Sequence, residues 1–174
     1  MKDKYPLLLG GKHVETSDIL NVINPFNNEV ISSVCRAAHM EAEAAIEAAD
    51  KAKDVISKMP SHEKTNILRN ISDKISDKKE EIARIITLEC GKPVSDSRTE
   101  VDRAALTFKI ASEEAARIGG EFISLDRNKV SEGRWGITRR FPAGTLFGIT
   151  PFNFPLNLVA HKIAPSIAAG SYNP

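Results

Sequence analysis

The sequence predicts a mixed α/β chain, and three observations support this class. Short runs of strand-forming residues occupy the first 36 positions and return after residue 121. Between them, apolar residues recur every three to four positions, which is the spacing of amphipathic helices. Near the end, an apolar run stops at Pro151 and gives way to another helix-like pattern. The predicted order is strands, helices, strands and one strand-to-helix unit.

The N-terminal segment predicts two antiparallel pairs of strands. Residues 6–16 contain two short runs around Gly10-Gly11, a dipeptide suited to a tight hairpin turn. Residues 19–25 and 29–35 are two further runs of strand-forming residues. The turn between them contains two asparagines, and asparagine tolerates the positive φ that such turns require.

Two amphipathic helices are predicted between residue 39 and Gly91. Pro60 ends the first, and Ser61 is placed to cap the second. The second is expected to run unbroken to Gly91, a typical glycine C-cap. The apolar stripes that support these helices are Ala45, Ala49, Ala52, Ile56 and Met59, followed by Ile67, Ile71, Ile75, Ile82, Ile85 and Ile86.

A third helix is predicted to end at Gly119-Gly120. Ser97 and Glu100 fit the two positions of a capping box, so the helix is expected to start close to residue 97. Charged residues on all three helices are most simply explained as solvated faces. The apolar stripe of the third helix is Val101, Ala104, Phe108, Ala111, Ala115 and Ile118.

Strands are predicted to return at 121–125 and 133–141, with a polar turn between them. In the second strand, Trp135 and Ile137 alternate with polar residues. This pattern favours a strand with one exposed face, or one that pairs with another subunit. Residues 145–151 then form a nearly continuous apolar run, which is typical of a strand buried on both faces of a parallel sheet.

The corner that follows this run holds the candidate catalytic residue, Asn153. Pro151 cannot donate to a sheet ladder, and Pro155 suits the first turn of a helix. Asn153 therefore lies on a stiff bend, and its amide offers two N–H donors. Donors oriented toward a developing oxyanion stabilise tetrahedral intermediates. The alternative is that Asn153 closes an Asx turn or caps the helix.

Composition excludes several classes of function. Lys plus Arg number 24 and Asp plus Glu 23, a net charge of +1, so we expect neither nucleic acid nor an anionic membrane as partner. The apolar share of 41% and charged share of 27% are those of an ordinary globular domain. No run approaches a membrane span, and the N-terminus lacks the apolar core of a signal peptide. A cytoplasmic location is the resulting expectation.

The two cysteines are predicted to be reduced, structural thiols. Cys35 and Cys90 are far apart, and neither has a His or Cys at metal-ligand spacing, so no metal site is expected. Neither has the basic neighbours of a reactive thiolate. No G-x-G-x-x-G motif occurs, so a nucleotide would be bound by strand-end groups instead of a glycine cradle.

The chain resembles the NAD(P)-dependent aldehyde dehydrogenase superfamily in several segments. The window 148–170 is similar to the family's signature region, and further similar segments fall in the family's order from residue 7 to residue 170. The sequence of residues 149–165 is most similar to that of lactaldehyde and non-phosphorylating glyceraldehyde-3-phosphate dehydrogenase-like members. The segments that carry the resemblance are "LLLGGKHVET", "NVINPFNNEVISSV", "LECGKPVSDSRTEVDRAA", "TRRFPAGTLFGITPFNFP" and "GITPFNFPLNLVAHKIAPSIAAG".

The resemblance implies an incomplete aldehyde dehydrogenase-like fold. Residues 1–120 would hold the N-terminal strands and a three-helix layer. Residues 121–143 would be bridging, oligomer-forming strands. Residues 144–174 would be the first β-α unit of the cofactor-binding domain, cut short by the end of the chain.

The resemblance also implies roles for single residues. The Asn153 amide would support the oxyanion of the thiohemiacetal that forms when a cysteine attacks an aldehyde. Arg103 matches an arginine that binds substrate phosphate in the glyceraldehyde-3-phosphate branch, although it also suits an ordinary surface position on a helix. The segment that would lie against the ribose and nicotinamide of NAD or NADP consists of Ile149, Thr150, Pro151 and Phe152.

The cysteine nucleophile and glutamate base of the family would lie beyond residue 174. Cys35 and Cys90 match no catalytic position. We therefore expect the N-terminal portion of an enzyme that oxidises a small-molecule aldehyde to a carboxylic acid with NAD(P). This portion alone is expected to be inactive, and its binding of the cofactor is doubtful. The alternative is a non-catalytic association module, with a homo-oligomer formed through the exposed strand 134–140. A nucleotide-binding domain without catalytic activity is a third alternative.

Overall fold

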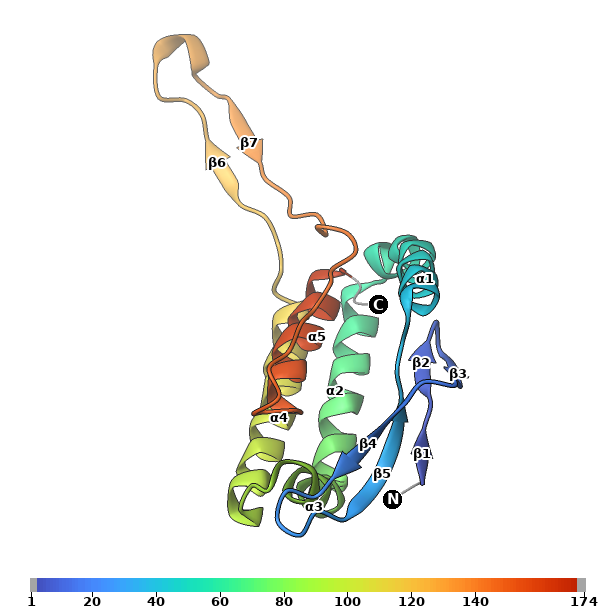
Figure 1. Cartoon of the computed structure of the whole chain (residues 1–174). Helices are drawn as coiled ribbons and strands as arrows, with labels where there is room; N and C mark the ends of the chain where they lie inside the picture. Colours follow the sequence, from blue (N-terminus) through green and yellow to red (C-terminus); the bar gives the residue numbers. More distant parts are fainter. Residues whose placement is uncertain (1–2, 172–174) are drawn as a thin grey trace.

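The computed structural model describes residues 3–171, in which three helices, α2, α4 and α5, lie side by side and a long hairpin projects from the body (Figure 1). Within residues 3–171, every helix is too short or too polar to serve as a membrane span. The helices are α1 (His39–Lys58), α2 (Ser61–Asp77), α3 (Lys79–Cys90), α4 (Val94–Ala115) and α5 (Asn157–Ala169), with a short 3-10 turn, η1 (Lys129–Ser131). The strands are β1 (Lys4–Tyr5), β2 (Leu7–Leu9), β3 (Lys12–Val14), β4 (Ile19–Ile23), β5 (Val30–Cys35), β6 (Phe122–Ser124) and β7 (Trp135–Ile137).

The N-terminal strands confirm the two predicted antiparallel pairs. β2 and β3 form a hairpin around Gly10-Gly11, and β4 pairs with β5. In the turn between β4 and β5, Asn28 adopts a φ of 61°, as expected of an asparagine turn. The pairing of β1 with β5, in the parallel sense, was not predicted, because β1 has only two residues and no pattern of its own.

The main core lies where α2, α4 and α5 meet. Alanine dominates it, and these small side chains let α4 and α5 approach closely around Phe108 and Leu68. The predicted stripe of the third helix is largely confirmed, although Ile118 is exposed. On α2, Ile67 is exposed and its neighbour Leu68 takes the buried position, which corrects the predicted stripe by one residue.

The prediction of one unbroken helix from Ser61 to Gly91 is wrong. The backbone leaves helical geometry at Lys78, with φ of −99° and ψ of 17°, so four helices precede the hairpin instead of three. The two halves pack into different clusters. Leu68 of α2 packs against α4 and α5, whereas Ala83 and Ile86 of α3 form a separate cluster with α4. One straight helix could not place its apolar residues in both clusters. No glycine or proline in the sequence marks the break at Lys78.

The predicted helix starts also need correction. Ser61 is the first residue of α2, and no side chain caps that end. α4 begins at Val94, directly after Pro93, so Ser97 lies inside the helix and is buried. Its hydroxyl is 2.9 Å from that of Thr87 on α3. The residues predicted as a capping box therefore make tertiary contacts.

The β6–β7 hairpin projects away from the helices (Figure 1). Its strands pair from Phe122 opposite Ile137 to Ser124 opposite Trp135, and the rings of Phe122 and Trp135 stack with centroids 5.5 Å apart. At its base, a Cβ on Gly120 would lie 1.6 Å from the carbonyl oxygen of Thr138, so only glycine permits this approach. The accessible surface is 12003 Å², whereas about 8,400 Å² is expected for a compact protein of this mass.

The segment 145–151 does not form the predicted buried strand. Only Thr145 makes an isolated bridge, and the following residues are exposed, with Phe147 81% and Ile149 75% accessible. Among residues 3–171, no neighbouring strand supplies ladder hydrogen bonds to this segment. The sequence pattern identified a segment suited to a parallel sheet, but such a strand forms only beside a partner.

Candidate functional site

The candidate site is the turn between the extended segment and α5. Asn153 lies in it with an exposed side chain, and α5 begins at Asn157. α5 begins two residues after Pro155, slightly later than predicted, because Pro155 was expected in its first turn. A helical hydrogen bond nevertheless spans it, because the N–H of Leu158 donates to the carbonyl of Phe154 at 3.1 Å. The turn therefore leads directly into α5.

Glu100 of α4 anchors the turn by capping α5. Its side chain is buried, with the residue 1% exposed. One carboxylate oxygen, Oε1, accepts the N–H of Leu156 at 2.9 Å and the N–H of Asn157 at 3.2 Å. A carboxylate at this position accepts from N–H groups that the helix itself leaves unpaired. Its negative charge also interacts favourably with the positive end of the helix dipole.

Lys92 completes the anchor from the corner between α3 and α4. Its ammonium lies 2.5 Å from Oε2 of Glu100 and donates to the carbonyl oxygen of Asn153 at 2.8 Å. It also lies 4.1 Å from the ring centroid of Phe154, a cation–π distance. The Lys92–Glu100 pair thus holds the backbone from the Asn153 carbonyl to Asn157.

The backbone conformation of the corner that carries Lys92 is itself constrained by its neighbouring residues. Gly91 has a φ of 67°, and a Cβ at that position would lie 2.8 Å from Cγ of Pro25. Glycine is required there on both counts. Pro93 is the N-cap of α4, and the side chain of Lys92, between Gly91 and Pro93, is only 15% exposed. The Lys92 ammonium therefore has little freedom to leave Glu100.

The Asn153 carboxamide is not used in holding the turn. Its side chain makes no hydrogen bond to any residue in the described range, and the helix end that it would cap is occupied by Glu100. The alternative that Asn153 closes an Asx turn or caps α5 is therefore wrong. The structure instead presents a free carboxamide on a turn with an anchored backbone.

The other predicted site residues are not all brought together. The segment from Ile149 to Phe152 leads directly to Asn153 and is exposed, with Phe152 89% accessible. Arg103 lies one turn after Glu100 on α4 and is exposed. Within residues 3–171, no hydrogen bond or ion pair joins Arg103 to the turn.

The sequence did not identify Lys92 as part of the site, and it predicted that Glu100 would belong to the capping box of its own helix. A signal for Glu100 was present, because the buried positions Val101, Ala104 and Phe108 define the inward face of α4. Glu100 falls at the edge of that face, and a carboxylate there needs a hydrogen-bonding or charged partner. Nothing in the sequence identified the N-terminus of α5, more than fifty residues away, as that partner.

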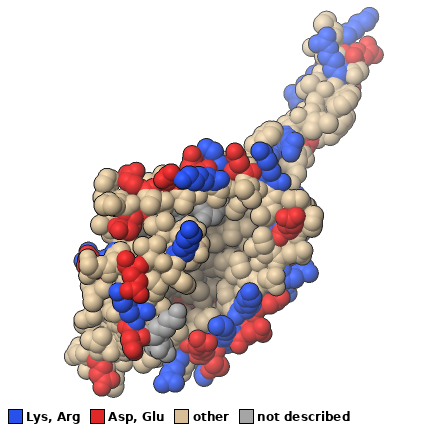
Figure 2. Space-filling model, turned by 90° about the vertical axis from the view of Figure 1, so that its right-hand side faces the viewer, with Lys and Arg blue, Asp and Glu red and all other residues tan. Residues whose placement is uncertain are grey.

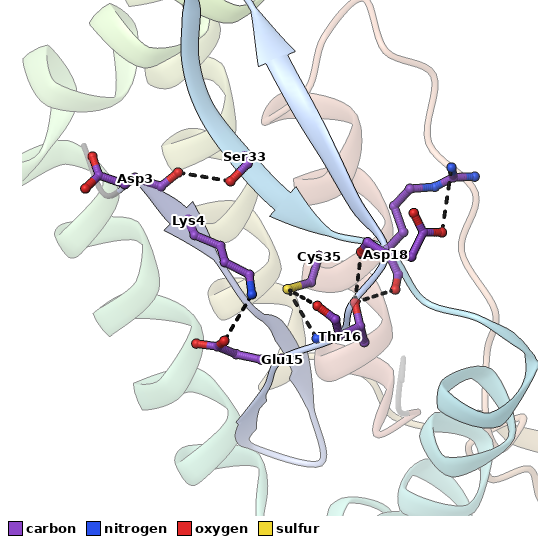
Figure 3. A network of polar contacts seen from close by, with 8 residues as sticks. Asp3, Lys4, Glu15, Thr16, Asp18, Ser33 and Cys35 are labelled. Atoms are coloured by element: carbon purple, nitrogen blue, oxygen red, sulfur yellow. Dashed lines mark hydrogen bonds and ion pairs between the residues drawn. The ribbon is translucent and has the colours of Figure 1, made fainter.

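The two cysteines are free, and Cys90 directly precedes the corner that carries Lys92. Cys35 is buried at the end of β5, where its sulfur accepts the N–H of Thr16 at 3.4 Å (Figure 3). Burial raises the pKa of the Cys90 thiol, and the charge of Glu89 raises it further. A raised pKa disfavours the thiolate, so Cys90 is unsuited to act as a nucleophile. In the described part of the chain, no cluster of His, Cys, Asp and Glu is arranged to hold a metal ion.

Charge is mixed on the face seen from the side of the strands. Figure 2 shows acidic and basic side chains interspersed around a hollow whose lining is largely uncharged. This face carries no patch of a single sign, in agreement with the near-zero net charge.

Comparisons with known proteins agree with the resemblance seen in the sequence. The model of the aldehyde dehydrogenase family matches residues 13–172. The lactaldehyde dehydrogenase of Methanocaldococcus jannaschii is 42% identical over 167 residues, which are 95% of this chain and 34% of the relative. The chain thus spans about a third of the length of the curated relatives it matches.

Solved structures show the same relation. Aldehyde dehydrogenase 21 from Physcomitrella patens, in complex with the reaction product succinate, superposes with a TM-score of 0.93 at 39% identity, over 99% of this chain and 36% of that one. Glyceraldehyde-3-phosphate dehydrogenase GapN from Methanocaldococcus jannaschii, complexed with NADP, has a TM-score of 0.82 at 44% identity, over 88% and 32%. Solved relatives thus hold NADP or NAD+. The predicted α/β class and the two predicted groups of relatives are confirmed.

Proposed function

We propose a function from one premise, which is that this chain belongs to the aldehyde dehydrogenase family. It corresponds to the N-terminal region of family members. In our proposal, the chain supplies the oxyanion-binding side of a site that oxidises an aldehyde to a carboxylic acid with NAD(P). Asn153 is the residue that acts there. Its amide donates to the oxygen that becomes negatively charged when a cysteine thiolate adds to the aldehyde.

One observation carries this proposal. Lys92 and Glu100 hold the backbone of the turn, while the Asn153 carboxamide has no partner among the described residues. An amide donor is effective at an oxyanion when its position is fixed before the charge develops. The arrangement meets this requirement, because the anchored backbone does not use the side chain.

The segment from Ile149 to Phe152 is proposed to form one side of the cofactor site. Its exposed, extended backbone has unused hydrogen-bonding groups and ends at the turn, which fits a ligand lying along it. Bound NAD(P) would accept the hydride of the thiohemiacetal. Arg103 is proposed to bind a phosphate or other anionic group of the substrate, because its guanidinium is exposed on the helix that carries Glu100.

Oxidation also requires a nucleophilic cysteine and a base, and Cys35 and Cys90 suit neither role. We expect no sustained turnover when the purified chain is incubated with lactaldehyde and NAD or NADP. A chimaera in which this chain replaces the matching third of the Methanocaldococcus jannaschii lactaldehyde dehydrogenase is expected to turn over. The same relative without that third is the control. Turnover by the chain alone, or a folded but inactive chimaera, would contradict the proposal.

A second candidate function, self-association through the hairpin, is favoured by its exposed apolar surface. Trp135 is 59% and Ile137 70% accessible, and the opposite strand adds Phe122. The excess of accessible surface noted above points in the same direction. We expect light scattering to report an oligomer and the double substitution Trp135→Ser with Ile137→Ser to yield a monomer. A monomeric unsubstituted chain would remove this candidate.

A further inference from the structure

A cavity of about 590 Å³ lies at the end of the helical layer away from Asn153. Its walls come from the end of α1, the start of α2, the base of the hairpin and the last turn of α5. α5 has 13 residues, so the cavity is about 20 Å from the turn at its other end. The basic residues that line it are Lys58, Lys64, Arg139 and Arg140, and no acidic residue does.

None of these four cations has an acidic partner in the described part of the chain. Among residues 3–171, none of them forms an ion pair, although the chain contains nearly as many acidic as basic residues. Lys64 is partly buried, and its ammonium would lie 3.4 Å from a Cβ built on Gly170. The guanidinium of Arg139 is held 5.2 Å from the ring centroid of Phe141. A partly desolvated ammonium without a counter-ion is unfavourable unless an anion supplies the charge.

The start of α2 adds to the positive potential of the cavity. No side chain caps this helix, and Pro60, Ser61 and Lys64 all line the cavity wall. The backbone carbonyl of Pro60 accepts the N–H groups of Glu63 and Lys64, which leaves the first N–H groups of the helix for a ligand. A helix of 17 residues presents about half a positive charge at this end.

The C-terminal ends of α1, α4 and α5 oppose this charge in part, since Lys58, Ala115 and Ala169 all line the cavity. Ala169 and Gly170 lie beside Lys64, and the carbonyl end of a helix carries about half a negative charge. Three such ends carry about one and a half negative charges, which is less than the charge of the four cations. The cavity therefore keeps a strong positive potential.

We propose that this cavity binds a small phosphate-bearing molecule. A phosphate dianion would accept from the Lys64 ammonium, from the arginine forks of Arg139 or Arg140, and from the free N–H groups of α2. The cavity volume leaves room for an attached sugar or nucleoside. This site is separate from the proposed aldehyde site and does not depend on it.

The test is calorimetric titration of the 174-residue chain with inorganic phosphate. We expect saturable binding, weakened at least 10-fold by Lys64→Met and by Arg140→Gln, since each removes a charge-assisted hydrogen bond. The control Lys12→Met removes an equal charge from β3 and should leave the affinity unchanged. Because Arg140 is exposed, Arg140→Gln should fold even if Lys64→Met does not.

Two outcomes would contradict the proposal that this cavity binds phosphate. The first is the absence of phosphate binding to the folded chain, or equal binding by all three variants. The second concerns urea unfolding measured with and without phosphate. If the cations only stabilise the end of α5, Lys64→Met should lower the urea midpoint and phosphate should leave it unchanged. If they form an anion site, phosphate should raise the midpoint of the unsubstituted chain and not that of Lys64→Met.

Discussion

Replacing Glu100 by alanine is expected to lower the free energy of unfolding by about 3–5 kcal/mol, the loss typical when one partner of a buried ion pair is removed. Three groups lose their partner at once. Lys92 would remain 85% covered without its counter-ion, since its side chain is only 15% exposed. The N–H groups of Leu156 and Asn157 would also lose their acceptor. Urea unfolding followed by circular dichroism measures the loss.

The matched control is Glu80→Ala. Glu80 also pairs with a basic residue, Arg98, at 2.8 Å, and this hydrogen bond lowers the pKa of the Glu80 carboxyl. The pair is exposed, so its removal should lower the free energy of unfolding far less than the removal of Glu100. Glu100→Gln keeps an acceptor oxygen for α5 and should fall between the two. Equal, small losses for Glu100→Ala and Glu80→Ala would show that the pair does not anchor the turn.

Periodicity along the sequence was a good guide wherever local pattern and tertiary packing agree. The hairpin at Gly10-Gly11 and the stripe containing Ala104 and Phe108 were predicted, because each element buries the face that its own sequence defines. The glycine C-cap at Gly91 was also predicted, because a left-handed residue there depends only on the chain beside it.

Tertiary contacts decided the elements that were predicted wrongly. Ser97 and Glu100 match a capping box, yet each is buried and bonded to another helix. A local motif cannot report which distant backbone groups need a carboxylate. The break at Lys78 has the same origin, because α2 and α3 pack into separate clusters.

The candidate site was predicted in part. The sequence identified Asn153 and the prolines beside it, and these residues form an exposed turn ahead of α5. It did not identify Lys92, whose contact with the Asn153 carbonyl spans 61 residues of sequence. The apolar run 145–151 predicted a buried strand, and burial of that run requires neighbouring strands that residues 3–171 do not contain.

The Asn153→Ala substitution is expected to lower kcat by about 10²–10³-fold in a chimaera that completes the enzyme, the usual effect of removing one oxyanion donor. The amide contacts the reacting oxygen only as charge develops, so the loss should fall on kcat and much less on KM. Stability should change little, because the Asn153 side chain is exposed and makes no hydrogen bond within the described residues. This combination separates a catalytic role from a structural one.

The decisive measurement is therefore kcat for aldehyde oxidation by the chimaera with Asn153→Ala, beside the control Asn66→Ala on the exposed side of α2. Our account predicts a decrease of at least 100-fold for Asn153→Ala, no decrease for Asn66→Ala, and the same urea midpoint for both. If Asn153→Ala turns over as fast as the unsubstituted chimaera, the carboxamide does not stabilise the oxyanion, and the proposed role of the turn is wrong.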